Sequence, residues 1–287
     1  MRRRMYMERK IVEKVTGFRT KDGAGVSLVR VLGTETVKTF DPILMLDSFD
    51  SINPDDYTAG FPLHPHRGIE TISLIVKGNM VHKDSLGNQD AISDREVQWM
   101  TAGSGILHEE MLPASERMLG VQLWLNMPAK DKMARPAYQS IKRDEIEAIP
   151  IAGGTLRLVS GSYQGHTGFK GHYLPLDYYD IVLDSNQKFT IDTKMDQSVM
   201  VFLLTGNAKI AGELVKEKTA VKLSQGTSLT IESQDCEIEI LFMSSEPLGE
   251  SVAWGGPIVM NTQEELNTAF RELRDGTFLK DSMDYNK

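Results

Sequence analysis

Two short segments of the chain carry histidine and carboxylate side chains at a spacing suited to metal binding. They are His64-Pro65-His66 and His108-Glu109-Glu110. Residues two apart in a β-strand project from the same face, so each segment can direct two side chains at one point. Three neutral imidazoles and one carboxylate suit a divalent transition metal and leave coordination positions open. The spacing therefore predicts one metal ion per chain, bound by His64, His66, His108 and Glu110.

The sequence around these segments alternates between apolar and polar residues, as short β-strands do. In residues 70–76, Ile72, Leu74 and Val76 fall on one face, and residues 119–125 alternate in the same way. Turns rich in Gly, Asn and Asp separate such segments, which is typical of β-sandwiches and β-barrels. The polar run 82–88 is interpreted as a loop, which favours a solvated His82 over a role in orienting a metal ligand.

The chain is long enough for two domains. A charged stretch at residues 142–147 and a turn at Gly153-Gly154 mark a junction, which predicts domains at residues 1–146 and 147–287. The second half repeats the strand pattern, notably at residues 198–204 and 237–242. It contains neither His-x-His nor His-x-Glu, so the second domain is predicted to bind no metal.

One short helix is predicted near the C-terminus. Thr262 and Glu265 have the spacing of a capping box, and Gly276 is a suitable end. The residues between them place an apolar stripe on one face: Leu266, Ala269, Phe270 and Leu273. That stripe is expected to pack against the first domain or at the junction of the two.

The composition excludes several classes of protein. A net charge of −8 argues against a nucleic-acid-binding surface, and no apolar run reaches the ~18 residues of a membrane span. A single cysteine excludes an internal disulfide framework and fits a reducing cytoplasm. Arg2-Arg3-Arg4 resembles the start of a signal peptide, but Glu8-Arg9-Lys10 interrupts it before any apolar core. We therefore expect a cytoplasmic globular protein without direct nucleic-acid or membrane partners.

Three long motifs occur in order in the first half of the chain. They are FPLHPHRGIET at residues 61–71, QWMTAGSGILH at 98–108 and GVQLWLNMP at 120–128, and residues 246–262 add a fitting C-terminal segment. Together they resemble the pirin family of the cupin superfamily. The resemblance implies an all-β bicupin, with two tandem antiparallel β-barrels of the jelly-roll type. It also implies one metal in the first domain, usually Fe(II), with Ni, Co, Mn, Cu and Zn as alternatives, and the ligands His64, His66, His108 and Glu110.

Glu70 is a rival to Glu110 as the carboxylate ligand. Cupins in general often take this ligand four residues after the second histidine of the first motif, which is the position of Glu70. The resemblance to pirins favours Glu110. Glu70 is then expected to orient a histidine from outside the ligand set.

The resemblance implies two alternative functions. One is a flavonol 2,3-dioxygenase (quercetinase) that acts on a flavonol-like molecule and dioxygen, with Glu110 serving as base as well as ligand. The other is an iron-binding, redox-sensing protein that interacts with a regulatory partner, for example as a transcriptional co-regulator, without turnover. An enzyme is expected to have an open approach to the metal, whereas a sensor can have a closed one.

Overall fold

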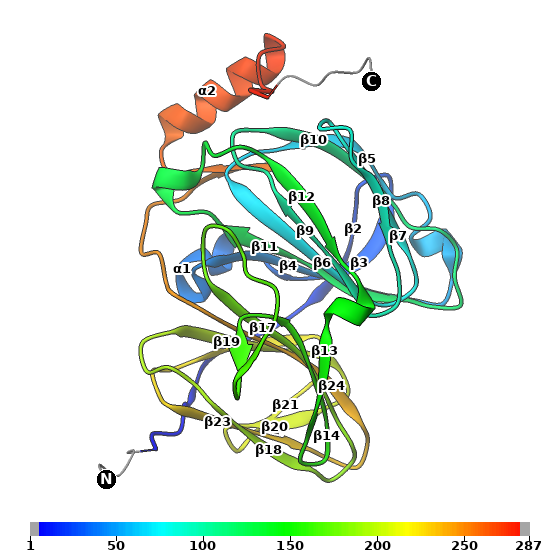
Figure 1. Ribbon diagram of the computed structural model, residues 1–287, viewed down its shortest axis with the longest axis vertical. Helices are drawn as coiled ribbons and strands as arrows, with labels where there is room; N and C mark the ends of the chain where they lie inside the picture. Colours follow the sequence, from blue (N-terminus) through cyan, green and yellow to red (C-terminus); the bar gives the residue numbers. More distant parts are fainter. Residues whose placement is uncertain (1–5, 282–287) are drawn as a thin grey trace. The chain divides into compact units, whose positions relative to one another are not determined.

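A computed structural model describes residues 6–281 and divides the chain into two compact units (Figure 1). Unit 1 comprises the segment ending at Gly17, Lys38–Pro42 and Asp144–Pro247. Unit 2 comprises Phe18–Val37, Ile43–Arg143 and the segment from Leu248 onward. The arginine run at residues 2–4 lies outside the described residues.

The C-terminal segment differs from the domain prediction. The sequence analysis assigned residues 248–287 to the second domain, but from Leu248 onward the chain packs within unit 2, with the predicted metal-binding half. The reason is a set of contacts to Arg67, which forms a bridge with Ile258 and an ion pair with Glu272. At the other end of the chain, strand β1 (Ile11–Thr16) pairs with β22 (Thr219–Leu223) and belongs to unit 1. Each unit is thus completed by a segment distant in sequence.

Unit 2 contains two antiparallel sheets and a hairpin. The larger sheet has the strand order β12-β9-β6-β11-β4-β3-β2 and the smaller one β5-β10-β7-β8, while β25 pairs with β26. The strands of the larger sheet are β2 (Phe18–Asp22), β3 (Val26–Leu32), β4 (Ile43–Ser51), β6 (Ile69–Lys77), β9 (Glu96–Thr101), β11 (Met118–Asn126) and β12 (Ala137–Ile141). The others are β5 (Phe61–His66), β7 (Met80–Asp84), β8 (Gln89–Ile92), β10 (Ile106–Met111), β25 (Ala253–Gly255) and β26 (Ile258–Met260).

Unit 1 repeats this plan with a seven-stranded and a four-stranded antiparallel sheet. The larger has the order β1-β22-β19-β24-β17-β14-β13 and the smaller β18-β23-β20-β21. The strands of the larger sheet are β1 (Ile11–Thr16), β13 (Glu147–Ile151), β14 (Gly154–Ser160), β17 (Leu176–Leu183), β19 (Ser198–Thr205), β22 (Thr219–Leu223) and β24 (Ile238–Ser245). The others are β18 (Lys188–Asp192), β20 (Ala208–Ile210), β21 (Glu213–Val215) and β23 (Ser228–Ser233), with the small pair β15 (Ser162–Tyr163) and β16 (His166–Thr167).

Helices are few and short. They are α1 (Val37–Phe40), α2 (Gln263–Arg274) and the single turns η1 (Thr34–Thr36), η2 (Pro54–Asp56), η3 (Ala129–Asp131) and η4 (Arg143–Glu145). In α2 the predicted capping box is present, since Glu265 N donates to Thr262 Oγ1 at 3.2 Å and Thr262 N donates to Glu265 Oε2 at 2.9 Å. No helix in residues 6–281 is both long and apolar enough to cross a membrane.

The predicted fold class is confirmed. The chain is mostly β-strand, with two units of similar sheet plan and a short C-terminal helix. The one difference is that each unit is a pair of open sheets and not a closed barrel.

The hydrophobic cores of the two units are arranged differently. Unit 1 is filled by one large apolar cluster that takes residues from both of its sheets. Unit 2 has separate clusters, one around Phe49, Tyr57 and Met80 and one around Met45, Met100 and Trp124.

Candidate metal centre

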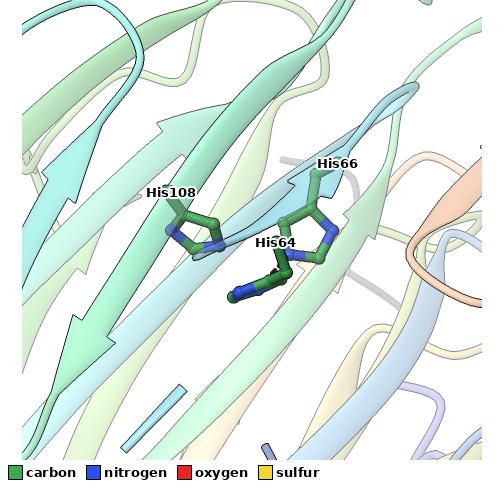
Figure 2. Close-up of side chains that lie close together, drawn as sticks. All are labelled: His64, His66 and His108. Atoms are coloured by element: carbon green, nitrogen blue, oxygen red, sulfur yellow. Dashed lines mark hydrogen bonds between the residues drawn. The ribbon is translucent and has the colours of Figure 1, made fainter. Parts of the chain in front are cut away.

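Two paired strands bring the three predicted histidine ligands together. Strands β5 and β10 are antiparallel neighbours, with His108 opposite His64 and Ile106 opposite His66. One ring nitrogen from each of His64, His66 and His108 lies within 4.8 Å of the others (Figure 2). The imidazole of His64 is 4.3 Å from that of His108, measured between ring centroids. The sequence prediction that these residues converge therefore agrees with the geometry.

Backbone carbonyls fix the orientation of His64 and His66. His64 Nδ1 lies 2.8 Å from the carbonyl oxygen of Pro62, and His66 Nδ1 lies 3.0 Å from that of Pro257. A carbonyl oxygen only accepts hydrogen bonds, so both Nδ1 atoms must carry the proton. In each neutral ring the Nε2 atom is then an unprotonated acceptor.

These two acceptor atoms face each other. His64 Nε2 is 3.1 Å from His66 Nε2. Two lone pairs at that distance repel unless a proton or a cation lies between them. Metal–nitrogen bonds of about 2.0–2.1 Å would allow both atoms to reach one ion. The donor set and its spacing thus fit a transition metal.

The surroundings oppose a proton at this position. Burial lowers the pKa of His66 to about 3, with a further contribution from neighbouring His64 and against the effect of the Pro257 carbonyl. Burial and the nearby imidazoles of His66, His64 and His82 also hold the pKa of His108 well below its usual value. His66 and His108 are consequently neutral at neutral pH, the form in which imidazole binds a metal.

The Nδ1 atom of His108 faces another buried histidine, His82. The Nε2 atom of His108 is buried without a hydrogen-bond partner, while its Nδ1 lies 3.5 Å from Nδ1 of His82. His82 Nε2 lies 2.9 Å from Asp84 Oδ2. The expectation of a solvated His82 is wrong, because its ring is fully buried in β7 and stacks on Tyr138 at 4.1 Å.

Glu110 belongs to a second group, formed with His82 and His108. Its carboxylate accepts hydrogen bonds from the side-chain amides of Gln98 and Gln122, the latter at 2.9 Å to Oε2. The role of Glu110 as fourth ligand stays a prediction. The sequence analysis missed both glutamines, although their position in otherwise apolar strands was a usable signal that they meet a polar partner.

Glu70 lies apart from both histidine groups. It is in β6, where it accepts a hydrogen bond from Thr101 Oγ1 at 2.6 Å. Ser73, which contacts the amides that hold Glu110, is three residues away and so points to the opposite face of the same strand. The spacing of Glu70 would place it on the same face as His66 only if one strand ran through both residues. The chain instead turns at Gly68 (φ 78°) between β5 and β6.

Buried basic side chains fasten the C-terminal segment next to the histidines. Arg67, which is 2% exposed, donates to the carbonyls of Ser104 and Phe278 and pairs with Glu272 at 2.7 Å. Lys132 Nζ donates to three oxygens, namely Gly68 O, Asn126 Oδ1 and Val259 O. These contacts hold the segment that supplies the Pro257 carbonyl to His66.

Comparisons with known proteins agree with this architecture. The family model described as Pirin matches residues 25–125, and the one described as Pirin C-terminal cupin domain matches residues 178–279. The chain belongs to the pirin family. A pirin-like protein of Caulobacter vibrioides is 38% identical over 274 residues, which cover 94% of this chain and 99% of the relative.

Solved structures of related proteins have a similar fold. The crystal structure of a quercetin 2,3-dioxygenase from Acinetobacter baumannii has a TM-score of 0.88 and 30% identity, and covers 95% of this pirin chain and 99% of its own. A bacterial pirin from Escherichia coli, solved in complex with nickel(II), has a TM-score of 0.65. It is 19% identical and covers 82% of this chain and 98% of its own, so it supports the fold alone.

Proposed function

We propose that this protein is a metal-dependent dioxygenase of the quercetinase type, cleaving flavonol-like substrates with dioxygen. The observation that carries the metal site is the pair of unprotonated Nε2 atoms of His64 and His66, 3.1 Å apart. The similarity to a quercetin 2,3-dioxygenase over nearly the whole chain supports the reaction class.

The proposed ligands are His64, His66 and His108, with Glu110 as the fourth. We propose Fe(II) as the resident metal, with nickel, cobalt, manganese, copper or zinc as alternatives. A divalent ion bound there would supply positive charge that favours the ionised form of an enolic or phenolic hydroxyl. Fold and family alone do not establish that chemistry, so it needs its own test.

The residues of the chain have separate tasks in this proposal. His64 is only partly buried, in contrast to His66 and His108, so a substrate reaches the centre on the side of His64. The amides of Gln98 and Gln122 donate to Glu110 and hold its carboxylate beside His108. We assign it the role of the base that takes the proton of the substrate hydroxyl.

Oxygen uptake by metal-loaded protein tests the proposal. With quercetin and Fe(II)-, Ni(II)- or Co(II)-loaded protein, we expect dioxygen consumption together with release of one carbon monoxide per dioxygen consumed. The His64→Ala protein should lose this activity. His166→Ala is the matched control, since His166 is an exposed histidine of unit 1 paired with Glu147.

Free metal ions oxidise flavonols slowly, so buffer with the same metal concentration is required as a blank. Correctly metallated protein that neither consumes dioxygen nor releases carbon monoxide with a panel of flavonols would contradict the enzymatic proposal. That result would favour the redox-sensing regulator, which uses the same ligands.

A further inference from the structure

A buried row of polar groups leads away from the histidine cluster. It begins at His108, continues through His82 and ends at Asp84. His82 and Asp84 lie together on β7, and His108 lies opposite Asp84 on the neighbouring strand β10. All three side chains are shielded from solvent.

The hydrogen bonds of Asp84 determine which atom donates and which accepts along this row. Asp84 Oδ1 accepts from the backbone N–H groups of Leu86 at 2.8 Å and Asn88 at 3.1 Å. Asp84 Oδ2 accepts from the side-chain amide of Asn88 and faces His82 Nε2 at 2.9 Å. Since a carboxylate only accepts, the proton of this contact must be on His82 Nε2.

The same logic extends to His108. In the tautomer with its proton on Nε2, His82 has an acceptor lone pair on Nδ1, which faces His108 Nδ1 at 3.5 Å. His108 must then donate from Nδ1, which leaves its buried Nε2 as a free acceptor. Tyr138 stacks on the His82 ring with an interplanar angle of 13° and keeps that ring in position.

We infer that Asp84 and His82 are positioning residues that set the tautomer of His108, so that its Nε2 is ready to bind the metal. The inference deepens the proposed function, because it rests on His108 being a metal ligand. His64 and His66 obtain the same tautomer from backbone carbonyls. His108 lacks such a carbonyl contact among its described hydrogen bonds and obtains it through a second histidine and a carboxylate.

Asp84→Asn is a directed test because the turn dictates how the new amide sits. The backbone N–H groups of Leu86 and Asn88 require an oxygen at the Oδ1 position. The NH₂ group must therefore take the Oδ2 position, where it donates one hydrogen to His82 Nε2 and the other to the Asn88 side-chain amide, which turns its oxygen toward residue 84. His82 then carries its proton on Nδ1, and His108 is driven to the Nε2–H tautomer, which blocks metal binding.

Long-range ¹H–¹⁵N correlation NMR of the metal-free protein reports the tautomer directly. We expect Nδ1–H on His108 in the natural protein and Nε2–H in Asp84→Asn. Competition with a chelator should show metal affinity falling by roughly 10- to 100-fold, the usual cost of changing a group that orients a ligand. Asp94→Asn is the matched control, since Asp94 also accepts a backbone N–H and pairs with a cation but contacts no histidine.

A double-mutant cycle separates this role from a structural one in the turn. In His82→Asn the new amide offers His108 Nδ1 an acceptor that does not depend on residue 84. Adding Asp84→Asn in that background should change metal affinity less than two-fold. Equal losses in both backgrounds, or an Nε2–H tautomer of His108 in the natural metal-free protein, would overturn the inference.

The two proposals fail in different ways. A natural protein that binds no metal would overturn the metal centre, whatever the tautomer. A protein that binds metal but shows the wrong His108 tautomer would overturn the relay alone. If Asp84→Asn does not fold, the tautomer of the natural protein still decides the question.

Discussion

The two units share a plan of sheets but differ in what their interiors contain. In unit 1 the four-stranded sheet buries two serines at the ends of β23, Ser228 and Ser233, and otherwise contributes apolar side chains to the core: Phe189, Ile191, Ala208, Ile210, Val215, Leu229 and Ile231. In unit 2 the corresponding four-stranded sheet contributes buried histidines and a carboxylate: His66, His82, His108 and Glu110. One plan thus supports a continuous apolar core in one unit and a polar centre between two smaller apolar clusters in the other.

Unit 2 shows how hydrogen-bond partners offset the cost of burying polar side chains. Burying a polar group without a hydrogen bond costs several kcal/mol, so each one in unit 2 needs a partner. The carbonyls of Pro62 and Pro257, the carboxylate of Asp84 and two glutamine amides provide these partners. In the histidine cluster these partners leave imidazole acceptors that point at one another, and a cation would satisfy them.

The largest expected effect comes from removing those acceptors. His64→Ala or His66→Ala should lower metal affinity by more than about 100-fold, because either change removes a ligand outright. Metal content of purified protein, measured by inductively coupled plasma mass spectrometry, should fall from about one ion per chain to a trace. His166→Ala and His172→Ala, both in unit 1, should retain the metal. Two ions per chain, or metal kept after loss of both His64 and His66, would contradict a single centre in unit 2.

The direction of the side chains within each short segment was predictable from sequence because it is local: His64 and His66 are two residues apart on one strand. That this strand lies beside the one carrying His108 is a long-range relation, and the resemblance to pirins predicted it. The strand pattern and the capped C-terminal helix were predictable because they too are local. Alternation and capping depend on near neighbours in the chain.

The misjudged parts depend on long-range contacts. His82 lies in a polar run, and only the pairing of β7 with β10 shows that it is buried beside His108. Glu70 has the sequence spacing from His66 that a cupin ligand requires, but the turn at Gly68 places it in a different sheet from His66. The grouping of residues 248–281 with unit 2 rests on Arg67, whose partners Glu272 and Phe278 are more than 200 residues away in sequence.

The next effect separates the two carboxylates. Glu110→Gln should weaken metal binding by roughly 10- to 100-fold, and Glu70→Gln should weaken it much less. The reason is that Glu110 lies beside His108, whereas Glu70 contacts Thr101 and belongs to neither histidine group. Chelator competition on the two variants gives the ranking. The reverse ranking would show that Glu70 reaches the metal in spite of its position in β6.

A third comparison concerns the buried arginines that fasten a terminal segment in each unit. Arg67 holds the C-terminal segment in unit 2, and Arg9 holds the N-terminal segment in unit 1 through the carbonyls of Lys194 and Ser224. Replacing either by Met leaves buried carbonyls without donors, at a cost of about 2–4 kcal/mol in unfolding free energy. Chemical denaturation measures that loss.

The two arginine variants should differ in metal binding. Arg67→Met loosens the segment that presents the Pro257 carbonyl to His66, so metal affinity should fall as well. Arg9→Met should leave metal affinity unchanged, because unit 1 supplies none of the proposed ligands. Equal metal affinity in the two variants would show that the C-terminal segment does not orient His66.

The smallest expected effect is a pH dependence that originates at Lys132 in unit 2. Burial lowers the pKa of Lys132 to about 7, and the carboxylates of Glu250 and Glu265 oppose the shift only in part. Between about pH 7 and the ordinary lysine value, the unfolded chain binds more protons at this residue than the folded one does. The part of the unfolding free energy that depends on Lys132 must then rise with pH across that range.

Compared with Lys132→Met, the natural protein should gain about 1–3 kcal/mol of unfolding free energy between pH 7 and pH 9.5. Urea denaturation at the two pH values measures the difference, with exposed Lys130→Met as control. A constant difference would mean that the three oxygens around Nζ keep Lys132 charged in the folded protein.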